Sequence, residues 1–526
     1  MRCRRAPAMA EPRSTWVSIA AMSGICLVMM LIALDQTVVG TALPRVVAEL
    51  QGYALYPWVA SAYLMTNAVM IAITGRLGDL YGRKPFVLAA IVLFTLASAL
   101  CGMAQSMLQL VLARALQGIG GGMLAGAAFA SVSDLFPDPL QRVRWQAMLS
   151  ATFGIATAMG PALGGWLTEH LGWRSVFYVN LPIGLLALPV VWRYLPHQVN
   201  HDSDDRSIDW LGAGLLAAGF CAILFTTERF GTLGLASPWL WAMVAGTGLV
   251  CWLFVRHQSR SRAPVIPPRL FAEKAVRQLC VLGFLTGLVM FVLIFYAPLL
   301  LQGGFGLSPK AAGMLVTPLL VSITVGSIIN GRLVPRLPQP EKLISWGLLV
   351  LMFGTALLAT LNDATPHWLM ALGFAICGLS LGFQLPNLTL QVQASVARAD
   401  VGVASALIQM TRMLGSMIGA SAAGLAVDLR YRQQVGEVLA GVHSPDIVRL
   451  LDSPQLLIRA QEQVQLGQLA DRLGLDAAGL LDGARLSLVS GIHLAFFACI
   501  VVTLLCYLIA RGLPPFVAAR TPAAAH

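Results

Sequence analysis

The chain has 526 residues, of which 57% are hydrophobic and only 11% are charged. Soluble domains carry about twice that share of charged residues, so the composition excludes a soluble domain and indicates a polytopic membrane protein. The net charge of +11 does not indicate nucleic-acid binding, because the basic residues are scattered through short loops rather than gathered on one domain.

Fourteen apolar stretches are each long enough to cross a bilayer as a helix. They span residues 16–38, 55–77, 85–105, 108–132, 145–169, 175–195, 210–228, 237–256, 277–301, 311–333, 343–361, 366–391, 401–428 and 487–511. With the N-terminus inside, 23 of the 35 Lys and Arg residues fall in inner segments and four in short outer loops. Cytoplasmic loops are enriched in Lys and Arg, so we expect an all-α protein with both termini in the cytoplasm.

Asp35 is the only charged residue between Trp16 and Pro44. A carboxylate near the middle of a membrane helix costs about 2.5 kcal/mol or more, and such groups usually line a cavity, pair with a cation or exchange protons. Arg114, in the fourth apolar stretch, is the second intramembrane charge. Two interpretations are open: a static buried pair, or a pair that is broken when Asp35 takes up a proton. We favour the second.

Gly-rich and charged residues gather where the second and third stretches meet. Glycines allow a tight turn there, and the charges can hold two helix ends together. The string resembles the G-x-L-a-D-r-x-G-r-k signature of the major facilitator superfamily, with Leu80 standing where that family usually has Arg. The residues concerned are Gly75, Gly78, Asp79, Gly82, Arg83 and Lys84.

A second glycine-rich string lies in the fifth stretch. It resembles the G-x(5)-G-P-x-x-G-G signature of proton-driven exporters within that superfamily. The Gly-Pro step is expected to bend the helix, and the remaining glycines to permit close contact with other helices. The residues are Gly154, Gly160, Pro161, Gly164 and Gly165.

Further strings resemble the fourteen-span drug:proton antiporters of the same superfamily. Residues 114–122 begin with R-x-x-Q-G. Residues 34–44 resemble L-D-x-T-I-V-N-x-A-L-P, with Gly40 in place of Asn, and residues 173–184 resemble W-R-x-x-F-x-x-N-x-P-x-G. Residues 209–214 open the seventh stretch with D-x-x-G. The resemblance extends from Trp16 to about Ala426.

This resemblance implies the major facilitator fold with 14 transmembrane helices, two six-helix bundles plus two inserted helices, and alternating access to a site near the membrane midplane. The expected divisions are a cytoplasmic segment 1–15, a first bundle 16–195, a linker with two extra helices 196–276, five helices of the second bundle 277–428, a periplasmic loop 429–486, the last helix 487–511 and a cytoplasmic tail 512–526.

Eight residues are candidates for lining the substrate cavity: Met30, Trp58, Tyr63, Phe295, Tyr296, Gln384, Asn387 and Arg412. Met and aromatic side chains suit varied apolar ligands. Arg412 either pairs with a carbonyl or lines the pathway. No carboxylate lies well inside the ninth to thirteenth stretches, so Asp35 is nearly alone as a proton carrier.

The long segment 429–486 contains an amphipathic pattern at 454–473. It is either a solvated cap on the outer surface or a docking element for a periplasmic adaptor that leads to an outer-membrane channel. The His and Asp residues at 197–205 are interpreted as a solvated linker, and no phosphate-binding loop is present. We expect no metal, cofactor, nucleic acid or enzymatic activity.

We therefore predict a bacterial inner-membrane transporter that uses protons to export drugs or other amphipathic toxic compounds. Its partners would be the amphipathic substrate, protons and the lipid bilayer. Two alternatives stay open: a dedicated carrier for a metabolite, lipid or siderophore, and a membrane sensor or scaffold that does not transport.

Overall fold

The computed structural model describes residues 15–50, 55–136, 138–196, 209–233, 237–261, 264–397, 400–439, 444–452, 454–457 and 460–515. Within these ranges the ordered elements are all helical. Helices are expected here, because a chain inside hydrocarbon must satisfy its backbone hydrogen bonds internally. Residues 197–208, which include the His and Asp cluster of the linker, lie outside the described ranges.

The first half of the chain forms α1 (Thr15–Leu50), α2 (Tyr56–Tyr81), α3 (Arg83–Gly102), α4 (Met107–Leu135), α5 (Pro139–His170), α6 (Ser175–Tyr178) and α7 (Asn180–Tyr194). The inserted pair is α8 (Trp210–Leu233) and α9 (Pro238–Gln258). The second half forms α10 (Lys274–Leu299), α11 (Pro309–Leu333), α12 (Lys342–Leu358), α13 (His367–Ala394), α14 (Val401–Val438) and α17 (Ala477–Ala510). Short helical turns lie at Pro268–Ala272, Leu300–Gly304 and Val334–Arg336.

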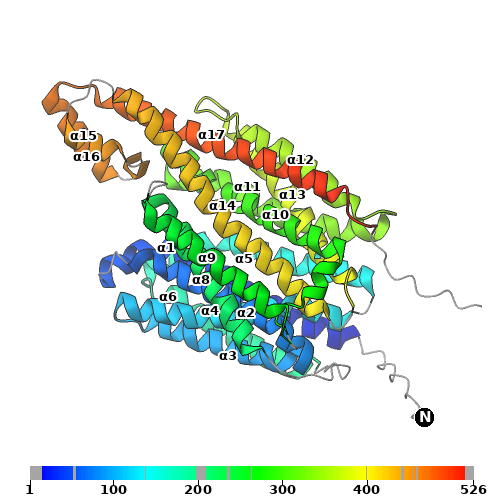
Figure 1. Ribbon diagram of the computed structural model, residues 1–526. Coiled ribbons are helices and arrows are strands. Elements are labelled where there is room, and N and C mark those ends of the chain that lie inside the picture. Colours follow the sequence, from blue (N-terminus) through cyan, green and yellow to red (C-terminus); the bar gives the residue numbers. More distant parts are fainter. Residues whose placement is uncertain are drawn as a thin grey trace, which may run out of the picture.

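The two halves repeat one packing pattern. In the first half α1 packs against α5 and α7, α4 packs against α2 and α3, and α3 also contacts α7. In the second half α10 packs against α14 and α17, α13 packs against α11 and α12, and α12 also contacts α17. Figure 1 shows the two resulting groups of helices, which we call the N-terminal and C-terminal bundles.

Glycines make the repeat visible at single residues. On α4, a Cβ at Gly118 would lie 2.3 Å from the backbone oxygen of Tyr63 on α2. On α13, a Cβ at Gly378 would lie 2.0 Å from the backbone oxygen of Leu319 on α11. Only glycine allows the backbones to approach this closely, as is usual at membrane helix contacts.

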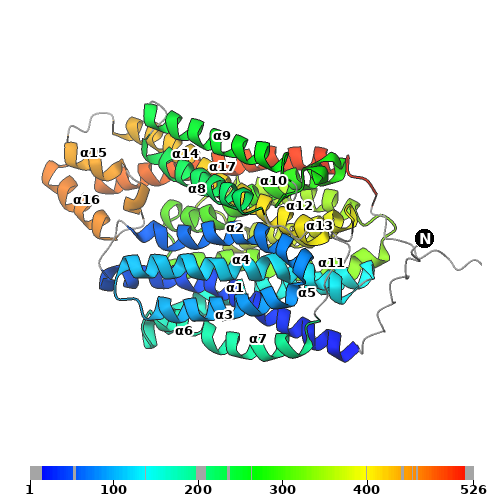
Figure 2. The same cartoon turned by 60° about the horizontal axis from the view of Figure 1, so that its bottom comes forward.

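The inserted helices lie along one seam between the bundles. α8 contacts α9, α2 of the N-terminal bundle and α14 of the C-terminal bundle, and Figure 2 shows the pair running beside α14. α9 exposes large apolar side chains along its length, among them Trp239, Trp241 and Trp252. Such a surface on α9 is suited to contact with lipid. Because α8 contacts both α2 and α14, it links the two bundles at this seam.

At one end of the molecule the chain extends beyond the bundles (Figure 1). α14 and α17 continue outward, and between them lie α15 (Pro445–Leu451), a 3-10 turn (Pro454–Leu457) and α16 (Ala460–Leu473). We call this the cap end and the opposite one the base end. The segment expected as a loop, 429–486, is largely helical, because its first residues continue α14 and its last residues belong to α17, and its periplasmic location stays a prediction.

The cap is packed rather than loose. Ile447, Leu451 and Leu466 are almost fully buried in a cluster that includes residues of α14 and α17. The hydroxyl of Tyr431 on α14 donates a hydrogen bond to the backbone oxygen of Leu451 at 3.0 Å. The opposite face of α16 is exposed, including Val464. This packing accounts for the amphipathic pattern without requiring a partner.

Eleven helices among the described residues are long and apolar enough to cross a membrane, and Ala62–Gly75 and Lys342–Leu358 are shorter apolar helices. Each of the fourteen predicted stretches coincides with helix, although 175–195 is divided at Val179 into α6 and α7. The repeated helix packing agrees with the expected arrangement of two helix bundles. The number of fourteen spans stays a prediction.

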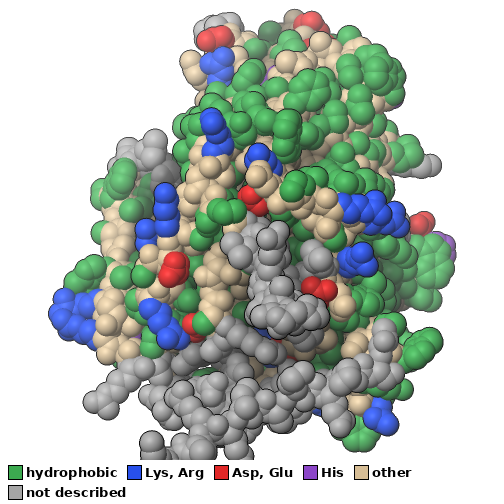
Figure 3. All heavy atoms as spheres, turned by 90° about the vertical axis from the view of Figure 1, so that its right-hand side faces the viewer, with side chains coloured by type: hydrophobic (Ala, Val, Ile, Leu, Met, Phe, Trp, Pro, Cys, Tyr) green, Lys and Arg blue, Asp and Glu red, His purple; other side chains and the backbone are tan. Residues whose placement is uncertain are grey.

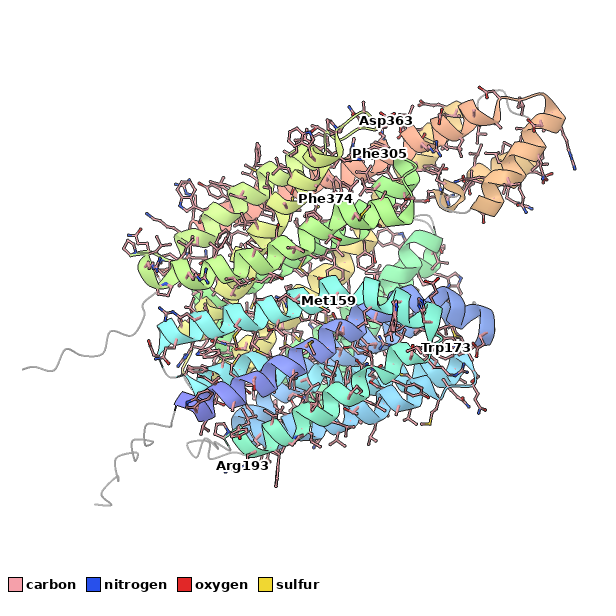
Figure 4. All side chains as sticks on the ribbon, turned by 180° about the vertical axis from the view of Figure 1, so that it is seen from behind. Met159, Trp173, Arg193, Phe305, Asp363 and Phe374 are labelled. Atoms are coloured by element: carbon pink, nitrogen blue, oxygen red, sulfur yellow. The ribbon has the colours of Figure 1, made fainter. Side chains whose placement is uncertain are left out.

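The bundles meet at the base end and separate toward the cap end. Described apolar residues near the base form clusters that contain side chains of both bundles. Toward the cap, one cluster belongs to the N-terminal bundle and another to the C-terminal bundle. Met159 of α5 lies where the bundles face each other (Figure 4) and is 55% exposed.

A pair of substitutions on α5 tests this packing. A Cβ at Gly160 would lie 2.6 Å from the Cβ of Thr37 on α1, whereas a Cβ at Gly165 would meet no atom within 4 Å. Gly160→Ala should force the helices apart and destabilise the protein by about 1–3 kcal/mol. Gly165→Ala should leave stability within about 0.5 kcal/mol of wild type. Thermal unfolding of the purified variants measures both, and equal effects would contradict the close approach of α1 and α5.

Candidate functional site

Asp35 and Arg114 form a buried ion pair between α1 and α4. Arg114 Nη1 donates to Asp35 Oδ2 at 2.7 Å. The Asp35 residue is 1% exposed and Arg114 is 3% exposed. Both lie inside the N-terminal bundle at membrane depth, so each neutralises a charge that would otherwise be very unfavourable there.

Three neutral polar side chains complete the surroundings of the carboxylate. Gln117 Nε2 of α4 donates to Asp35 Oδ1 at 2.7 Å and to Ser98 Oγ of α3 at 2.7 Å. Asn180 Nδ2 of α7 donates to the same Asp35 oxygen at 3.0 Å. Asp35 on α1 therefore accepts hydrogen bonds from side chains of α4 and α7. With Ser98 on α3, the network joins four helices of the bundle.

The guanidinium has further acceptors of its own. Arg114 Nη1 also donates to Gln117 Oε1 at 2.7 Å, and Nε donates to the backbone oxygen of Val59 at 3.2 Å. The guanidinium carbon lies 4.2 Å from the ring centre of Tyr63, a cation–π contact. When Asp35 is protonated, Arg114 would lose its charged partner but keep these contacts. The arrangement can thus hold either protonation state.

Arg83, in the string between α2 and α3, forms a second buried ion pair. Arg83 Nη1 lies 2.6 Å from Asp134 Oδ2 at the end of α4, and it donates to the backbone oxygen of Ala130. Gly82, with φ of 82°, provides the left-handed turn that the sequence predicts. The side chain of Asp79 lies outside the described residues, and Lys84 is half-buried.

Glycines of the strings on α2 and α5 lie at contacts between helices. A Cβ at Gly75 would lie 2.6 Å from the Cβ of Ala406 on α14, and one at Gly78 would lie 3.1 Å from Arg83 Cγ. A Cβ at Gly154 would lie 2.1 Å from Thr324 Oγ1 on α11.

The expected close contact is wrong for Gly165, which is exposed and has open space in place of a Cβ. Gly164 is buried, while the side chain of Pro161 lies outside the described residues. α5 remains helical through this step.

Trp173 and Arg174 hold the short α6 region to the end of α1. Trp173 Nε1 donates to Glu49 Oε2 at 2.8 Å, and Arg174 forms an ion pair with the same carboxylate. Arg174 and Trp173 hold the pKa of Glu49 below its ordinary value. Residues 173–184 therefore hold α1 at two places. Trp173 and Arg174 bind Glu49 near the end of α1, and Asn180 donates a hydrogen bond to Asp35.

Asp209 connects the inserted helices. Its Oδ1 accepts from the backbone N–H of Gly212 and lies 2.7 Å from His257 Nε2, and its Oδ2 accepts from Gln258 Nε2 at 3.0 Å. Burial favours the neutral acid, but the hydrogen bonds from His257 and Gly212 hold the pKa of Asp209 below its ordinary value. The residue caps α8 and binds the end of α9.

The expected cavity residues do not share one cavity in this conformation. Met30 packs into the N-terminal core, and Tyr63 is 1% exposed beneath Arg114. Trp58 packs on Phe225 of α8, with ring centres 5.2 Å apart. In this conformation the three side chains contact neighbouring helices, Met30 and Trp58 while half-buried and Tyr63 while buried, and their assignment to a substrate cavity stays a prediction.

The C-terminal candidates differ among themselves. Phe295 is 58% exposed and stacks on Phe291, whereas Tyr296 packs against the C-terminal core. Gln384 donates to Ser380 Oγ at 2.9 Å, and Asn387 exchanges two hydrogen bonds with Asn330 of α11. Gln384 and Asn387 thus form hydrogen bonds within their bundle in this conformation, and their role in a substrate cavity stays a prediction.

Arg412 is different from these residues. Its side chain is half-buried, and the residue packs against Gly287 of α10. Among the described residues no carboxylate and no carbonyl accepts a hydrogen bond from its guanidinium. Of the two interpretations given by the sequence, pairing with a carbonyl is therefore not observed.

A polar chain closes the space between the bundles at the base end. Gln146 Nε2 of α5 donates to Gln393 Oε1 of α13 at 2.9 Å, and Gln393 Nε2 donates to Ser405 Oγ of α14 at 2.9 Å. All three residues are almost fully buried. No sequence pattern predicts this hydrogen-bonded Gln–Gln–Ser series, because isolated Gln and Ser residues are common in membrane helices.

Comparison with known proteins identifies the relatives of this architecture. The family model described as Major Facilitator Superfamily matches residues 25–420. The multidrug transporter protein MdtP of Bacillus subtilis is 34% identical over 413 residues, which cover 78% of this chain and 75% of that protein. Multidrug resistance protein 3 of the same species is 29% identical over 423 residues, covering 80% and 81% of the two chains.

A solved structure shares the fold over almost the whole chain. The human organic anion transporter MFSD10 (TETRAN) aligns with a TM-score of 0.63, covering 94% of this chain and 99% of that one. The identity is 14%, so this likeness concerns the fold alone.

A double-mutant cycle tests the ion pair. Arg114→Met should destabilise the protein by about 3–5 kcal/mol, because it leaves a buried carboxylate without its partner. Asp35→Asn combined with Arg114→Met should recover part of that loss, since no uncompensated charge remains. Thermal unfolding in detergent gives the coupling between the two positions. Additive losses would contradict a direct pair.

Proposed function

Because the chain belongs to the major facilitator superfamily, we propose that it is a secondary transporter that uses a proton gradient to export drugs or other amphipathic toxic compounds. The Asp35–Arg114 pair is the single observation on which the proton coupling depends. In the proposed cycle Asp35 takes up a proton on the outer side as substrate leaves, and releases it to the inner side as substrate binds.

The buried network supports this role. An ionised Asp35 is stabilised by Arg114, Gln117 and Asn180, whereas a protonated Asp35 is neutral and tolerates an apolar environment. Arg114 keeps Val59 and Gln117 as acceptors in either state. The O–H of a protonated Asp35 would face the N–H donors of Arg114, Gln117 and Asn180. Protonation should therefore loosen these contacts, as a switching pair requires.

The arrangement of the bundles supports alternating access. Here the bundles are joined at the base end by Gln146, Gln393 and Ser405, while their cap-end cores are separate. Asp35 is enclosed within the N-terminal bundle in this conformation, so proton exchange requires the hydrogen-bond network around it to open. Contacts of Gly75 with α14 and Gly154 with α11 lie on the surfaces that would separate.

We assign the base end to the cytoplasm and the cap end to the outside of a bacterial inner membrane. Figure 3, viewed from the base end, shows Lys and Arg side chains spread over this face, and Arg193 also lies there (Figure 4). Excess Lys and Arg marks the cytoplasmic side. With this assignment the described conformation is outward-facing, and we propose that the chain has both termini inside and crosses the membrane fourteen times.

The substrate assignment has support from relatives that are named as multidrug transporters. They favour broad export over a dedicated metabolite, lipid or siderophore carrier. The enclosed charge network also argues against a sensor or scaffold that does not transport. An adaptor and an outer-membrane channel remain a separate hypothesis for the cap, whose exposed surface on α16 would have to provide the contact.

Asp35→Asn should abolish transport that is driven by a pH gradient. In proteoliposomes loaded with the neutral amphipathic dye N-phenyl-1-naphthylamine, wild type should move the dye against its gradient when a pH difference is imposed, because Asp35 couples the two flows. The variant should lose uphill transport by more than about 10-fold yet still exchange labelled for unlabelled dye. Uphill transport at the wild-type rate in Asp35→Asn would contradict the coupling.

Thiol accessibility tests the proposed outward-facing state. In a background without native cysteines, Met159→Cys should react with a membrane-impermeant maleimide added from the cap side. Gln146→Cys should react from neither side while the base is closed, because Gln146 has no exposed surface. Rapid labelling of Gln146→Cys from the base, together with protection of Met159→Cys, would show the opposite conformation.

A further inference from the structure

Arg412 belongs to a polar face of α14. Ser405, Gln409, Arg412 and Ser416 follow one another at intervals of four, three and four residues, so they lie on one side of the helix. Ser405 accepts a hydrogen bond from Gln393 of α13, and Ser416 donates to the backbone oxygen of Gly287 on α10 at 3.3 Å. This face is therefore directed toward the interior and not toward lipid.

The helix that carries this face lies between the two bundles. α14 contacts α2 and α4 of the N-terminal bundle as well as α13. Toward the base the face ends at Ser405, where the Gln146–Gln393–Ser405 chain closes the space between the bundles. Arg412 lies two helical turns farther toward the cap, on the side from which this space is open in the described conformation.

The polar groups of this face are not fully satisfied. Gln409 is 7% exposed, and its Oε1 has no hydrogen-bond partner among the described residues. The guanidinium of Arg412, three residues farther on, also has none there. Two neighbouring groups with unused hydrogen-bonding capacity, one of them a half-buried cation, are thus available to an oxyanion that enters this space.

The balance of charged residues in the interior indicates the sign of the charge on such a ligand. Asp35 and Arg114 neutralise each other. Within α10 to α13 the sequence contains no Asp or Glu, and on α14 Asp428 is paired with Arg432 near the cap end. Arg412 thus contributes an uncompensated positive charge. A guanidinium binds planar or multidentate oxyanions with paired hydrogen bonds.

We propose that Arg412 and Gln409 bind an anionic group of the substrate, so that the transported compounds include amphipathic organic anions such as carboxylates and sulfonates. The apolar part of such a compound would occupy the space between the bundles. This inference rests on the proposed transport function and specifies its substrate class. It also distinguishes the two arginines: Arg114 serves the proton-binding carboxylate, and Arg412 serves the substrate.

Two dyes that differ in one anionic group provide the test. 8-Anilinonaphthalene-1-sulfonate and N-phenyl-1-naphthylamine share an aromatic scaffold, and only the first carries a sulfonate. Binding to the full-length protein in lipid nanodiscs is followed by dye fluorescence, with empty nanodiscs as background. Efflux of both dyes from proteoliposomes is measured under a pH gradient. The variants are Arg412→Gln, Arg412→Lys and, as a matched control on the outer extension of α14, Arg432→Gln.

Wild type and Arg432→Gln should bind the sulfonate more tightly than the neutral dye. Arg412→Gln should weaken sulfonate binding by about 10- to 100-fold and leave binding of the neutral dye unchanged, which also shows that the variant is folded. Arg412→Lys should retain part of the preference, because it keeps the charge but not the paired geometry. Equal binding of the two dyes by wild type, or an unchanged preference in Arg412→Gln, would overturn the proposal.

The two measurements separate this inference from the transport function. If the sulfonate binds through Arg412 but neither dye moves under a pH gradient, the result supports the anion site and contradicts proton-driven export. If the neutral dye is exported and the sulfonate is neither bound nor moved, export stands and the anion site is overturned.

Discussion

The architecture depends on keeping a carboxylate inside the N-terminal bundle. Asp35 is almost fully buried at membrane depth, and removing such a charge from water costs several kcal/mol unless it is paired and hydrogen-bonded. Arg114, Gln117 and Asn180 provide that pairing from α4 and α7. The helices that supply these groups are therefore held together whenever Asp35 is ionised.

Alternating access requires that contacts between the two bundles break and re-form. At the base these consist of the neutral Gln146–Gln393–Ser405 chain, apolar packing and glycines such as Gly75 that lie against α14. Neutral hydrogen bonds contribute about 0.5–1.5 kcal/mol each, much less than an isolated buried charge costs. A strong network inside one bundle and weaker contacts between bundles fit rigid-body motion. α8, which contacts both α2 and α14, must follow that motion at its seam.

The sequence was sufficient for features that depend on composition and local pattern. A single acid in an apolar run identified Asp35, a single base in another identified Arg114, and the left-handed turn at Gly82 followed from the glycine-rich string. The sequence did not identify Gln117, Ser98 or Asn180 as partners, because neutral polar residues in membrane helices are not distinctive. It also did not predict that Trp58 packs on Phe225 and that Tyr63 lies against Arg114, since the face a residue occupies depends on helix rotation. The limits of the cap were missed because α14 and α17 continue as helices beyond their apolar stretches.

The central claim is that Asp35 changes its protonation state when substrate binds. Infrared difference spectroscopy of the reconstituted protein measures this directly, because a protonated carboxyl absorbs separately from a carboxylate. At mildly acidic pH, addition of a transported substrate should remove a protonated-carboxyl band in wild type, and Asp35→Asn should lack that band. A substrate-induced spectrum that is identical in the two proteins would show that Asp35 does not exchange protons and that the buried pair is structural.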